Sequence, residues 1–471
     1  MLEKKYIIRR KLEQQTPIIH FQHDQKGATL RATEVKPKLD TFILSKTGTK
    51  KAEDCGWFIK DTKALNYKLR FFIENYNENN VKISKSGDLD IEAQKLELNG
   101  ESNRAKAIRD QAKNEINAMY FANMVSSKKN GVLVDLDEYA SDVKKQYKET
   151  VFYSKKSPII MEIICFIPTL RDAIEKHLEE FFIVHNFGSR QSKGFGGFKL
   201  LPKDNEKGRS ALEILQENGY QFFYAACRTN DVSALMNHAM IVYAILKGGL
   251  NMTGWDKNHY KTPNNYIKGY IQRRFISDAF ENGDQIGGDK AYIKRYKRVP
   301  HNFIIHENRK HSDSENQYSE YKFMRILLGM ADHYEFHHIH QGNVNVYSLG
   351  ETGYDVQRFR SPITIKILEG KIFFVFDVRS LQLIAGKRFY FLLNKREQQE
   401  LLGLNQYAQQ KAYIQQKGIS IQVPEIGSAE MKILIEKFIK YFNAEKTKLR
   451  NFAPRYQNTA NIILQRGNIN E

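Results

Sequence analysis

A glycine-rich and basic segment, NFGSRQSKGFGGFK, occupies residues 186–199 of the chain. It contains Gly188, Gly194, Gly196 and Gly197 within ten positions. Glycine tolerates positive φ and allows close backbone approach, so successive N–H groups of such a loop can face an anion. The segment, called the glycine loop below, therefore predicts a phosphate-binding loop. An ordinary glycine-rich turn is the alternative.

The side chains of the glycine loop agree with an anionic ligand. Arg190 and Lys193 would add positive charge, and Phe195 would either stack on a base or anchor the loop. Two familiar phosphate motifs do not fit. Lys193 precedes Gly194 instead of following it as in a P-loop, and Lys199 replaces the last glycine of a dinucleotide fingerprint.

The residues around the glycine loop predict the order strand, helix, loop, strand. Residues 158–167 form a continuous apolar run of β type. A helix is expected from Thr169, as its cap, to about residue 182, because its apolar residues recur at spacings of three and four. A strand is expected near residues 198–201. This order is half of a ferredoxin-like unit.

The first fifty residues predict a strand, a basic loop and a short helix. Residues 6–13 have strand composition, and Pro17 ends that strand. The basic stretch 26–38 contains Pro37, which favours a loop before a helix at 39–44. Eleven basic and five acidic residues fall within positions 1–50.

A different composition marks residues 84–150, which are rich in helix formers of mixed charge. Positions 101–150 carry nine basic and eight acidic residues, so the excess positive charge lies elsewhere. This segment predicts a solvated helical insertion.

The second half of the chain repeats the same order of elements. The expected elements are a strand at 220–227, a helix at 232–246, strands at 362–368 and 371–378 joined at Glu369-Gly370, and a helix at 429–448. The polar stretch at 203–218 predicts a boundary between domains 1–205 and 206–471. The expected fold is α+β, with two tandem ferredoxin-like domains and a helical insertion in the first.

Charge and hydropathy restrict the class of partner. Lys and Arg number 73 against 54 Asp and Glu, a formal net charge of +19. Such an excess favours a polyanionic partner, with a merely basic protein as the alternative. No run of 18 uncharged apolar residues and no signal-peptide core appear, so we expect nucleic acid rather than a membrane. The three cysteines Cys55, Cys165 and Cys227 are far apart, which favours the reducing cytoplasm over a disulfide framework.

Candidate catalytic residues are few. The histidines within 333–340 (HYEFHHIH) lack an HExxH motif, and a surface cluster is favoured over a metal site. His20 and His23 are weak candidates for a general base. Asp40 is a conceivable residue for metal-assisted cleavage, with a cap or surface aspartate as the preferred interpretation. The sequence predicts no catalytic residue, no metal and no cofactor.

A glycine-rich basic loop late in a ferredoxin-like unit resembles the signature of the RAMP proteins of CRISPR type III systems. Further segments resemble the RNA-capturing head subunit of Cmr-type effector complexes. These are 31–36 (RATEVK), 266–269 (YIKG), 325–329 (RILLG) and 358–362 (RFRSP). Two features depart from the family: LDTFIL replaces an aromatic-rich start of the first helix, and the insertion at 84–150 has no counterpart.

The resemblance implies a non-catalytic RNA-binding subunit at the end of the crRNA-bearing filament. Its partners would be crRNA on the 3′ side, target RNA and other type III effector subunits, in the cytoplasm and not at a membrane. The expected RNA contacts are Arg31, Lys36, Lys38, Gly188, Arg190, Lys193, Gly194, Phe195, Gly196, Arg358 and Arg360. A surface pair at a strand entrance is the alternative for the last two. A RAMP ribonuclease that processes crRNA or cleaves target RNA, and a scaffold whose charge serves protein contacts, remain the alternative functions.

Overall fold

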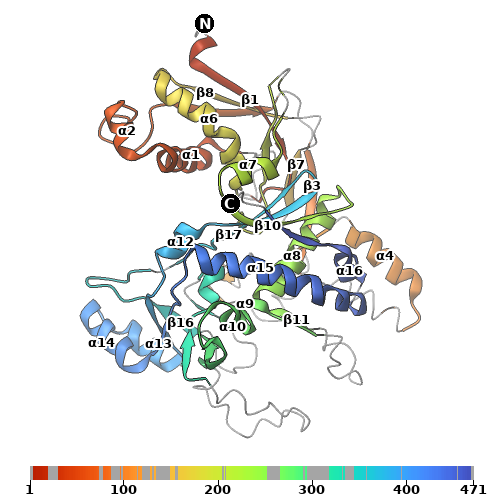
Figure 1. Cartoon of the computed structure of the whole chain (residues 1–471), viewed down its shortest axis with the longest axis vertical. Coiled ribbons are helices and arrows are strands. Elements are labelled where there is room, and N and C mark those ends of the chain that lie inside the picture. Colours follow the sequence, from red (N-terminus) through yellow and green to blue (C-terminus); the bar gives the residue numbers. More distant parts are fainter. Residues whose placement is uncertain are drawn as a thin grey trace. The chain divides into compact units, whose positions relative to one another are not determined.

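The structure is a computed structural model of the 471-residue chain (Figure 1). It describes residues 4–19, 30–73, 78–85, 96, 99–113, 115–118, 128–129, 132–133, 149–153, 158–203, 206, 208–251, 266–289, 292–293, 318–330, 333–334, 344–356, 358–393, 395–452 and 454–467. The chain forms two compact units, residues 1–242 with 364–375 and 449–471, and residues 243–363 with 376–448.

The first sheet has the ferredoxin-like strand order that the sequence predicts. Its strands are β1 (Ile7–Gln14), β2 (Lys68–Ile73), β8 (Ile159–Ile164) and β9 (Phe198–Leu200). They lie in the order β2-β8-β1-β9, and all neighbouring pairs are antiparallel. Counted along the chain this is 2-3-1-4, with a helix between the first and second strands and another between the third and fourth.

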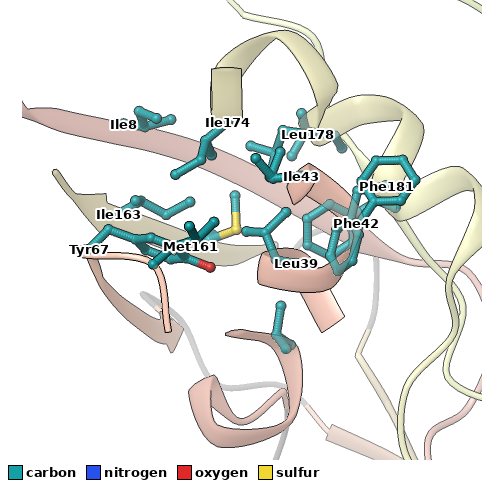
Figure 2. Packing of buried hydrophobic residues seen from close by; sticks show 14 of the residues in the cluster. Ile8, Leu39, Phe42, Ile43, Tyr67, Met161, Ile163, Ile174, Leu178 and Phe181 are labelled. Atoms are coloured by element: carbon teal, nitrogen blue, oxygen red, sulfur yellow. The ribbon is translucent and has the colours of Figure 1, made fainter. Parts of the chain in front are cut away.

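Helices α1 (Ala32–Thr47) and α6 (Pro168–Val184) cover one face of this sheet. Successive strand residues point to opposite faces, so only every second residue of a strand enters this core. Figure 2 shows Ile8 and Ile163 of the sheet packed with Ile174 of α6 and Leu39 of α1. Each of these four side chains is at most 3% exposed.

Helix α1 begins earlier than the sequence predicts, and the expected basic loop at 26–38 is wrong from residue 32 onward. Pro37 lies inside the helix. It costs about 3 kcal/mol by removing one backbone hydrogen bond. Burial of Val35, Leu39 and Ile43 stabilises the helix by about 1.5–3 kcal/mol per side chain. Apolar burial therefore exceeds the cost of the proline.

Helix α6 confirms the expected helix but not its cap. Ile167 is the N-cap residue, and Pro168 occupies the first turn, where its missing N–H costs nothing. The hydroxyl of Thr169 instead accepts a hydrogen bond from Nε1 of Trp57 at 2.8 Å. Thr169 as the cap was a wrong prediction, because this residue serves a tertiary contact.

The insertion contains a helix and also strands that its composition does not indicate. Helix α4 spans Ser102–Lys113. Strands β3 (Glu78–Lys85), β4 (Glu115–Ala118) and β7 (Glu149–Tyr153) form a three-stranded sheet, and β5 (Lys128–Lys129) pairs with β6 (Val132–Leu133). Only part of 84–150 lies within the described residues.

A second sheet repeats the strand order of the first. Its strands are β10 (Gln221–Ala226), β17 (Ile363–Leu368), β18 (Lys371–Phe376) and β21 (Leu464–Arg466), in the order β17-β18-β10-β21. Helix α8 (Val232–Lys247) follows β10, and α15 (Ser428–Glu445) precedes β21. Both sheets therefore read 2-3-1-4 along the chain, which confirms two ferredoxin-like domains. Glu369 and Gly370 have φ of 56° and 69°, as a tight hairpin turn requires.

The long segment between α8 and β17 and the segment between β18 and α15 together build a six-stranded sheet. Its strands are β13 (Ile286–Gly288), β14 (Glu320–Lys322), β15 (His333–Tyr334), β16 (Val344–Tyr347), β19 (Arg388–Leu392) and β20 (Ile419–Gln422). The remaining elements include α2 (Thr49–Asp54), α7 (Ala211–Glu217), β11 (Gly249–Asn251), β12 (Tyr266–Lys268), α9 (Tyr270–Arg273), α10 (Phe275–Ala279), α12 (Val378–Gln382), α13 (Lys395–Leu402), α14 (Tyr407–Lys417) and α16 (Pro454–Gln457). Among the described residues, no helix has the length and apolarity needed to cross a membrane.

Candidate RNA interface

The glycine loop closes on itself through backbone contacts at its base. Asn186 and Gly197 form an antiparallel bridge, and the N–H of Phe187 donates to the carbonyl of Gly196 at 2.9 Å. Gly196 has φ of 69°, and a Cβ at this position would lie 1.8 Å from the carbonyl oxygen of Phe187. A side chain cannot be accommodated here, so glycine is a steric requirement of the loop.

The loop amides donate hydrogen bonds into the protein. The N–H of Gly188 donates to Oε1 of Glu34 at 2.6 Å, and that of Gly196 donates to the carbonyl of Pro17 at 2.8 Å. Thr16 Oγ1 accepts from the N–H of Gly197 at 2.7 Å and donates to the carbonyl of Gly194 at 2.6 Å. The predicted cradle of outward amides is therefore wrong for Gly188, Gly196 and Gly197, because these donors are already used within the fold.

A buried lysine from β17 supports the base of the loop. The amino group of Lys366 donates to the carbonyl of His185 at 2.6 Å and to Oδ1 of Asn186 at 2.7 Å. Asn186 Nδ2 in turn donates to the carbonyls of Gln191 and Ile365, at 2.6 and 2.8 Å. Lys366 is 0% exposed, and burial holds its pKa well below the usual range. This network connects the loop to a strand far along the chain.

Helix α1 contacts the other side of the loop through Lys38 and Glu34. The amino group of Lys38 donates to Oε1 of Gln191 at 2.8 Å and to the carbonyl of Asn186 at 3.2 Å. It also lies 3.3 Å from Oε1 of Glu34 and 4.9 Å from the ring centroid of Phe187. Lys38 therefore positions the loop, a role that the expected RNA contact did not include.

Lys36, another expected RNA contact, is engaged beneath the helix. Its amino group donates to Oδ2 of Asp40 at 2.9 Å and to the carbonyl of Leu65 at 2.7 Å. It also lies 4.1 Å from the ring centroid of Tyr67. Lys36 therefore serves the packing of α1 in this structure, and its expected role in RNA contact has no support from the geometry.

The remaining cations of the loop region are partly accessible. Arg31 is the N-cap residue of α1, and it lies three positions before Glu34 and seven before Lys38, both of which contact the loop. Arg31, Arg190 and Lys193 are all half-buried. Arg190 has φ of 57°, and burial lowers its pKa to about 10, so it remains charged at neutral pH. Arg190 and Lys193 belong to the glycine loop and Arg31 begins the helix that contacts it, and we call these three side chains the positive rim of the glycine loop.

Phe195 does not present its ring to solvent. Its side chain is 0% exposed. Of the two interpretations from the sequence, the structure therefore supports the anchor, because a fully buried ring offers no face on which a base could stack. Gly194, its neighbour, has φ of 89° and is also buried.

The second compact unit brings together two sequence segments that resemble the RAMP family. The bridge between Met330 and Phe359 joins RILLG at 325–329 to RFRSP at 358–362. A Cβ on Gly329 would lie 2.8 Å from the backbone nitrogen of Ser361. Arg358 and Arg360 flank this bridge and are exposed. The proximity of the two segments was not evident from the sequence.

Three of the residues that shape the site were missed at the sequence level: Thr16, Glu34 and Lys366. Lys366 had a detectable signal, since it is the one charged residue in the apolar strand ITIKIL. A lysine in such a run is almost never fully buried unless it is paired. Thr16 and Glu34 carry no comparable local signal, because their partners lie more than 150 residues away.

The catalytic candidates have different environments. Asp40 is buried and paired with Lys36, so the interpretation as a surface or capping aspartate was wrong. His333 lies in β15, whereas the other histidines up to 340 and also His20 and His23 lie outside the described residues. Within the described part of the chain, no group of three His, Cys, Asp or Glu side chains is placed to hold a metal ion.

Comparison with known protein families covers most of the chain. Residues 5–250 match the model of the Cmr1 N-terminal domain, and residues 272–462 match that of the Cmr1 C-terminal domain. No curated protein gives a significant match. The matched ranges contain the first ferredoxin-like sheet, the glycine loop and strands β10, β17 and β18 of the second sheet, whereas β21 lies just beyond them. The chain therefore belongs to the Cmr1 family and is a RAMP subunit of a type III CRISPR effector complex.

Proposed function

We propose that this Cmr1 chain is a non-catalytic subunit that holds RNA, on the crRNA 3′ side or on the target strand, and caps the subunit filament of the complex in the cytoplasm. The observation that carries the proposal is the rigid glycine loop with its positive rim of Arg31, Arg190 and Lys193. Arg358 and Arg360 add an exposed basic pair in the second unit. We also propose that the two domains divide near residues 205 and 206.

The physical argument rests on preorganisation. The hydrogen bonds of Lys366, Asn186 and Lys38 fix the loop without a ligand, so binding RNA requires little ordering of the backbone. Half-buried cations then act from fixed positions in a partly desolvated site, where their attraction to phosphate is stronger than in water. Contacts of this kind recognise the RNA backbone rather than its sequence.

The test is the salt dependence of binding to a labelled single-stranded RNA. Arg31→Gln with Lys193→Gln should lower affinity and reduce the slope of log K against log salt by about 1.4, since each phosphate contact on a single strand contributes about 0.7. Lys50→Gln with Lys51→Gln is the matched control, because both lysines are exposed on α2. Equal slopes for the two double variants would contradict the proposed site.

The position of the RNA and the absence of catalysis need a second experiment. In the reconstituted effector, 4-thiouridine placed in the 3′ segment of the crRNA should cross-link to this subunit more strongly than the same base in the 5′ segment. Cleavage of RNA by the purified chain, abolished by His20→Ala or Asp40→Asn, would instead establish the ribonuclease.

A further inference from the structure

The face of the first sheet opposite α1 and α6 carries most of the charge of its strands. In β1, Ile8 and Leu12 enter the core, so Ile7, Arg9 and Lys11 point to the other side. Arg9 and Lys11 are exposed. We call this side the open face.

Cross-strand register shows which residues share the open face. One row joins Arg9 to Glu162 of β8 and Arg70 of β2. The other positions of the open face follow from the same alternation. They are Lys11, Ile160 and Phe72 in one row, Ile7, Ile164 and Lys68 in another, and Glu13 with Lys199 at the β9 edge.

The residues of the open face carry a net positive formal charge. Its cations are Arg9, Lys11, Lys68, Arg70 and Lys199, and its anions are Glu13 and Glu162. Arg70 Nε donates to Oε1 of the buried Glu162 at 2.8 Å, and Lys199 lies 2.5 Å from Oε1 of Glu369. Two of the five cations are therefore engaged with carboxylates, and five cations against two anions give these seven residues a formal charge of +3.

Two guanidinium groups lie close to the ring of Phe72, the one aromatic residue among the strand positions named above. The Cζ atom of Arg9 lies 5.3 Å from the ring centroid of Phe72, and that of Arg70 lies 6.0 Å from it. The Arg70 side chain is 65% exposed although it is paired. Guanidinium planes held in this way can stack on an unpaired base while they attract phosphate.

We propose that the open face is a second contact surface for single-stranded RNA, separate from the glycine loop. The proposal rests on the proposed function only in taking RNA as the ligand. Charge complementarity selects a polyanion, and the arginines around Phe72 select one with planar bases. The central strands place aliphatic and charged residues, and no aromatic ring, on this face. Binding should therefore be insensitive to RNA sequence.

The experiment compares two triple variants of the full chain. Arg9→Gln, Lys11→Gln and Lys68→Gln together should reduce the salt slope of single-stranded RNA binding by about 2, because three contacts of about 0.7 each are removed. Lys50→Gln, Lys51→Gln and Lys60→Gln together change the net charge by the same amount at exposed positions away from the open face. This control should leave the slope within a few tenths of the original.

Cross-linking gives a second test of the open face that does not depend on measured RNA affinities. Ultraviolet cross-linking of the bound RNA should yield adducts on the peptides that contain residues 7–13 or 68–73, and Phe72→Leu should remove those at 68–73. Circular dichroism of each variant checks that the sheet is intact. If the triple variant is unfolded, the adducts of the unmodified chain still decide the matter, and their absence from both peptides overturns the proposal.

The results for the two sets of variants distinguish RNA binding at the open face from RNA binding at the glycine loop. Loss of binding on changing Arg31 and Lys193, with no effect of the open-face triple, would overturn the open face and leave the proposed function intact. No RNA binding by the unmodified chain would remove both. An open-face triple that binds RNA normally but fails to assemble with other effector subunits would show a protein-binding face instead, which also overturns the proposal.

Discussion

At the scale of single residues, several positions in the glycine loop are determined by space rather than by chemistry toward a ligand. Gly196 illustrates this, since its backbone lies against the carbonyl of Phe187. Lys366 illustrates the converse, because its buried amino group donates to the carbonyl of His185 and to Oδ1 of Asn186 at the base of the loop. The sequence identified the glycines correctly as special but interpreted them as anion donors.

Gly196→Ala should destabilise the first unit far more than Gly219→Ala. The two glycines have φ of 69° and 67°, so the conformational cost of about 1–2 kcal/mol is shared. Only at Gly196 would the new methyl group lie 1.8 Å from a backbone oxygen, that of Phe187. The backbone must then move, which lowers the free energy of unfolding by a further amount of about 1–3 kcal/mol. Urea unfolding followed by circular dichroism measures the difference. Equal urea midpoints for Gly196→Ala and Gly219→Ala would show that the loop accommodates the added methyl group without cost.

His238 should make stability depend on pH. Nδ1 of His238 forms a hydrogen bond with Oγ1 of Thr459 at 2.8 Å. Burial of the ring lowers the pKa of His238 to about 4. An unfolded histidine titrates near 6.5, so the unfolded state binds a proton that the native state does not. Stability is therefore full above about pH 6.5 and falls by up to about 3 kcal/mol as the pH decreases to 4.

The control for this residue is His238→Gln, which retains a hydrogen-bonding group for Thr459. The free energy of unfolding of this variant should decrease less between pH 6.5 and pH 4 than that of the unmodified chain. Parallel pH profiles for the two proteins would mean that the buried ring does not cause the loss.

At the scale of elements, α1 and the glycine loop form one structural unit, although Asn186 lies 139 positions after Thr47. The sequence predicted a basic loop at 26–38 before a helix at 39–44, and the family resemblance implied that Arg31, Lys36 and Lys38 contact RNA. The structure shows that Lys36 and Lys38 contact carbonyl and side-chain oxygens within the protein. The sequence predicted only residues 39–44 of this helix, and it could not show what Lys38 contacts, because Asn186 and Gln191 lie 148 and 153 positions away.

Lys38→Met should loosen the glycine loop without unfolding α1. Removal of the amino group deletes hydrogen bonds to Gln191 and Asn186, each contributing about 1 kcal/mol. The amides of Gly188 and Lys193 should then exchange with deuterium about tenfold faster. Lys50→Met, at an exposed position of α2, should leave these rates unchanged. Unchanged exchange in Lys38→Met would contradict the positioning role.

At the scale of the whole molecule, two sheets with the same strand order are built from very different lengths of chain. The strands of the first sheet come from residues 7–200, and those of the second sheet come from residues 221–466. The last strand, β21, pairs with β10 through Phe223–Arg466 and Ala225–Leu464. The C-terminal segment is thus an integral part of the second sheet.

Ending the chain after residue 448 should abolish a stable second sheet. Loss of β21 exposes the backbone edge of β10, and an exposed, apolar strand edge favours aggregation. Size-exclusion chromatography should show aggregates or no soluble protein. A chain ending at Gly467, which retains β21, should elute like the full-length protein. A monomeric, folded product of the shorter chain would contradict this assignment.

The sequence by itself determined the fold class and the two ferredoxin-like domains, and its short motifs carried the resemblance to the family. The fold depends on local signals: apolar periodicity, turn residues such as Glu369-Gly370, and glycines that adopt positive φ. Only the tertiary structure decided where the charged side chains point. Lys366 bonds to a residue 181 positions away, and Lys38 to one 153 positions away. No local pattern encodes such partners, because they are brought together by the packing of α1, the glycine loop and β17.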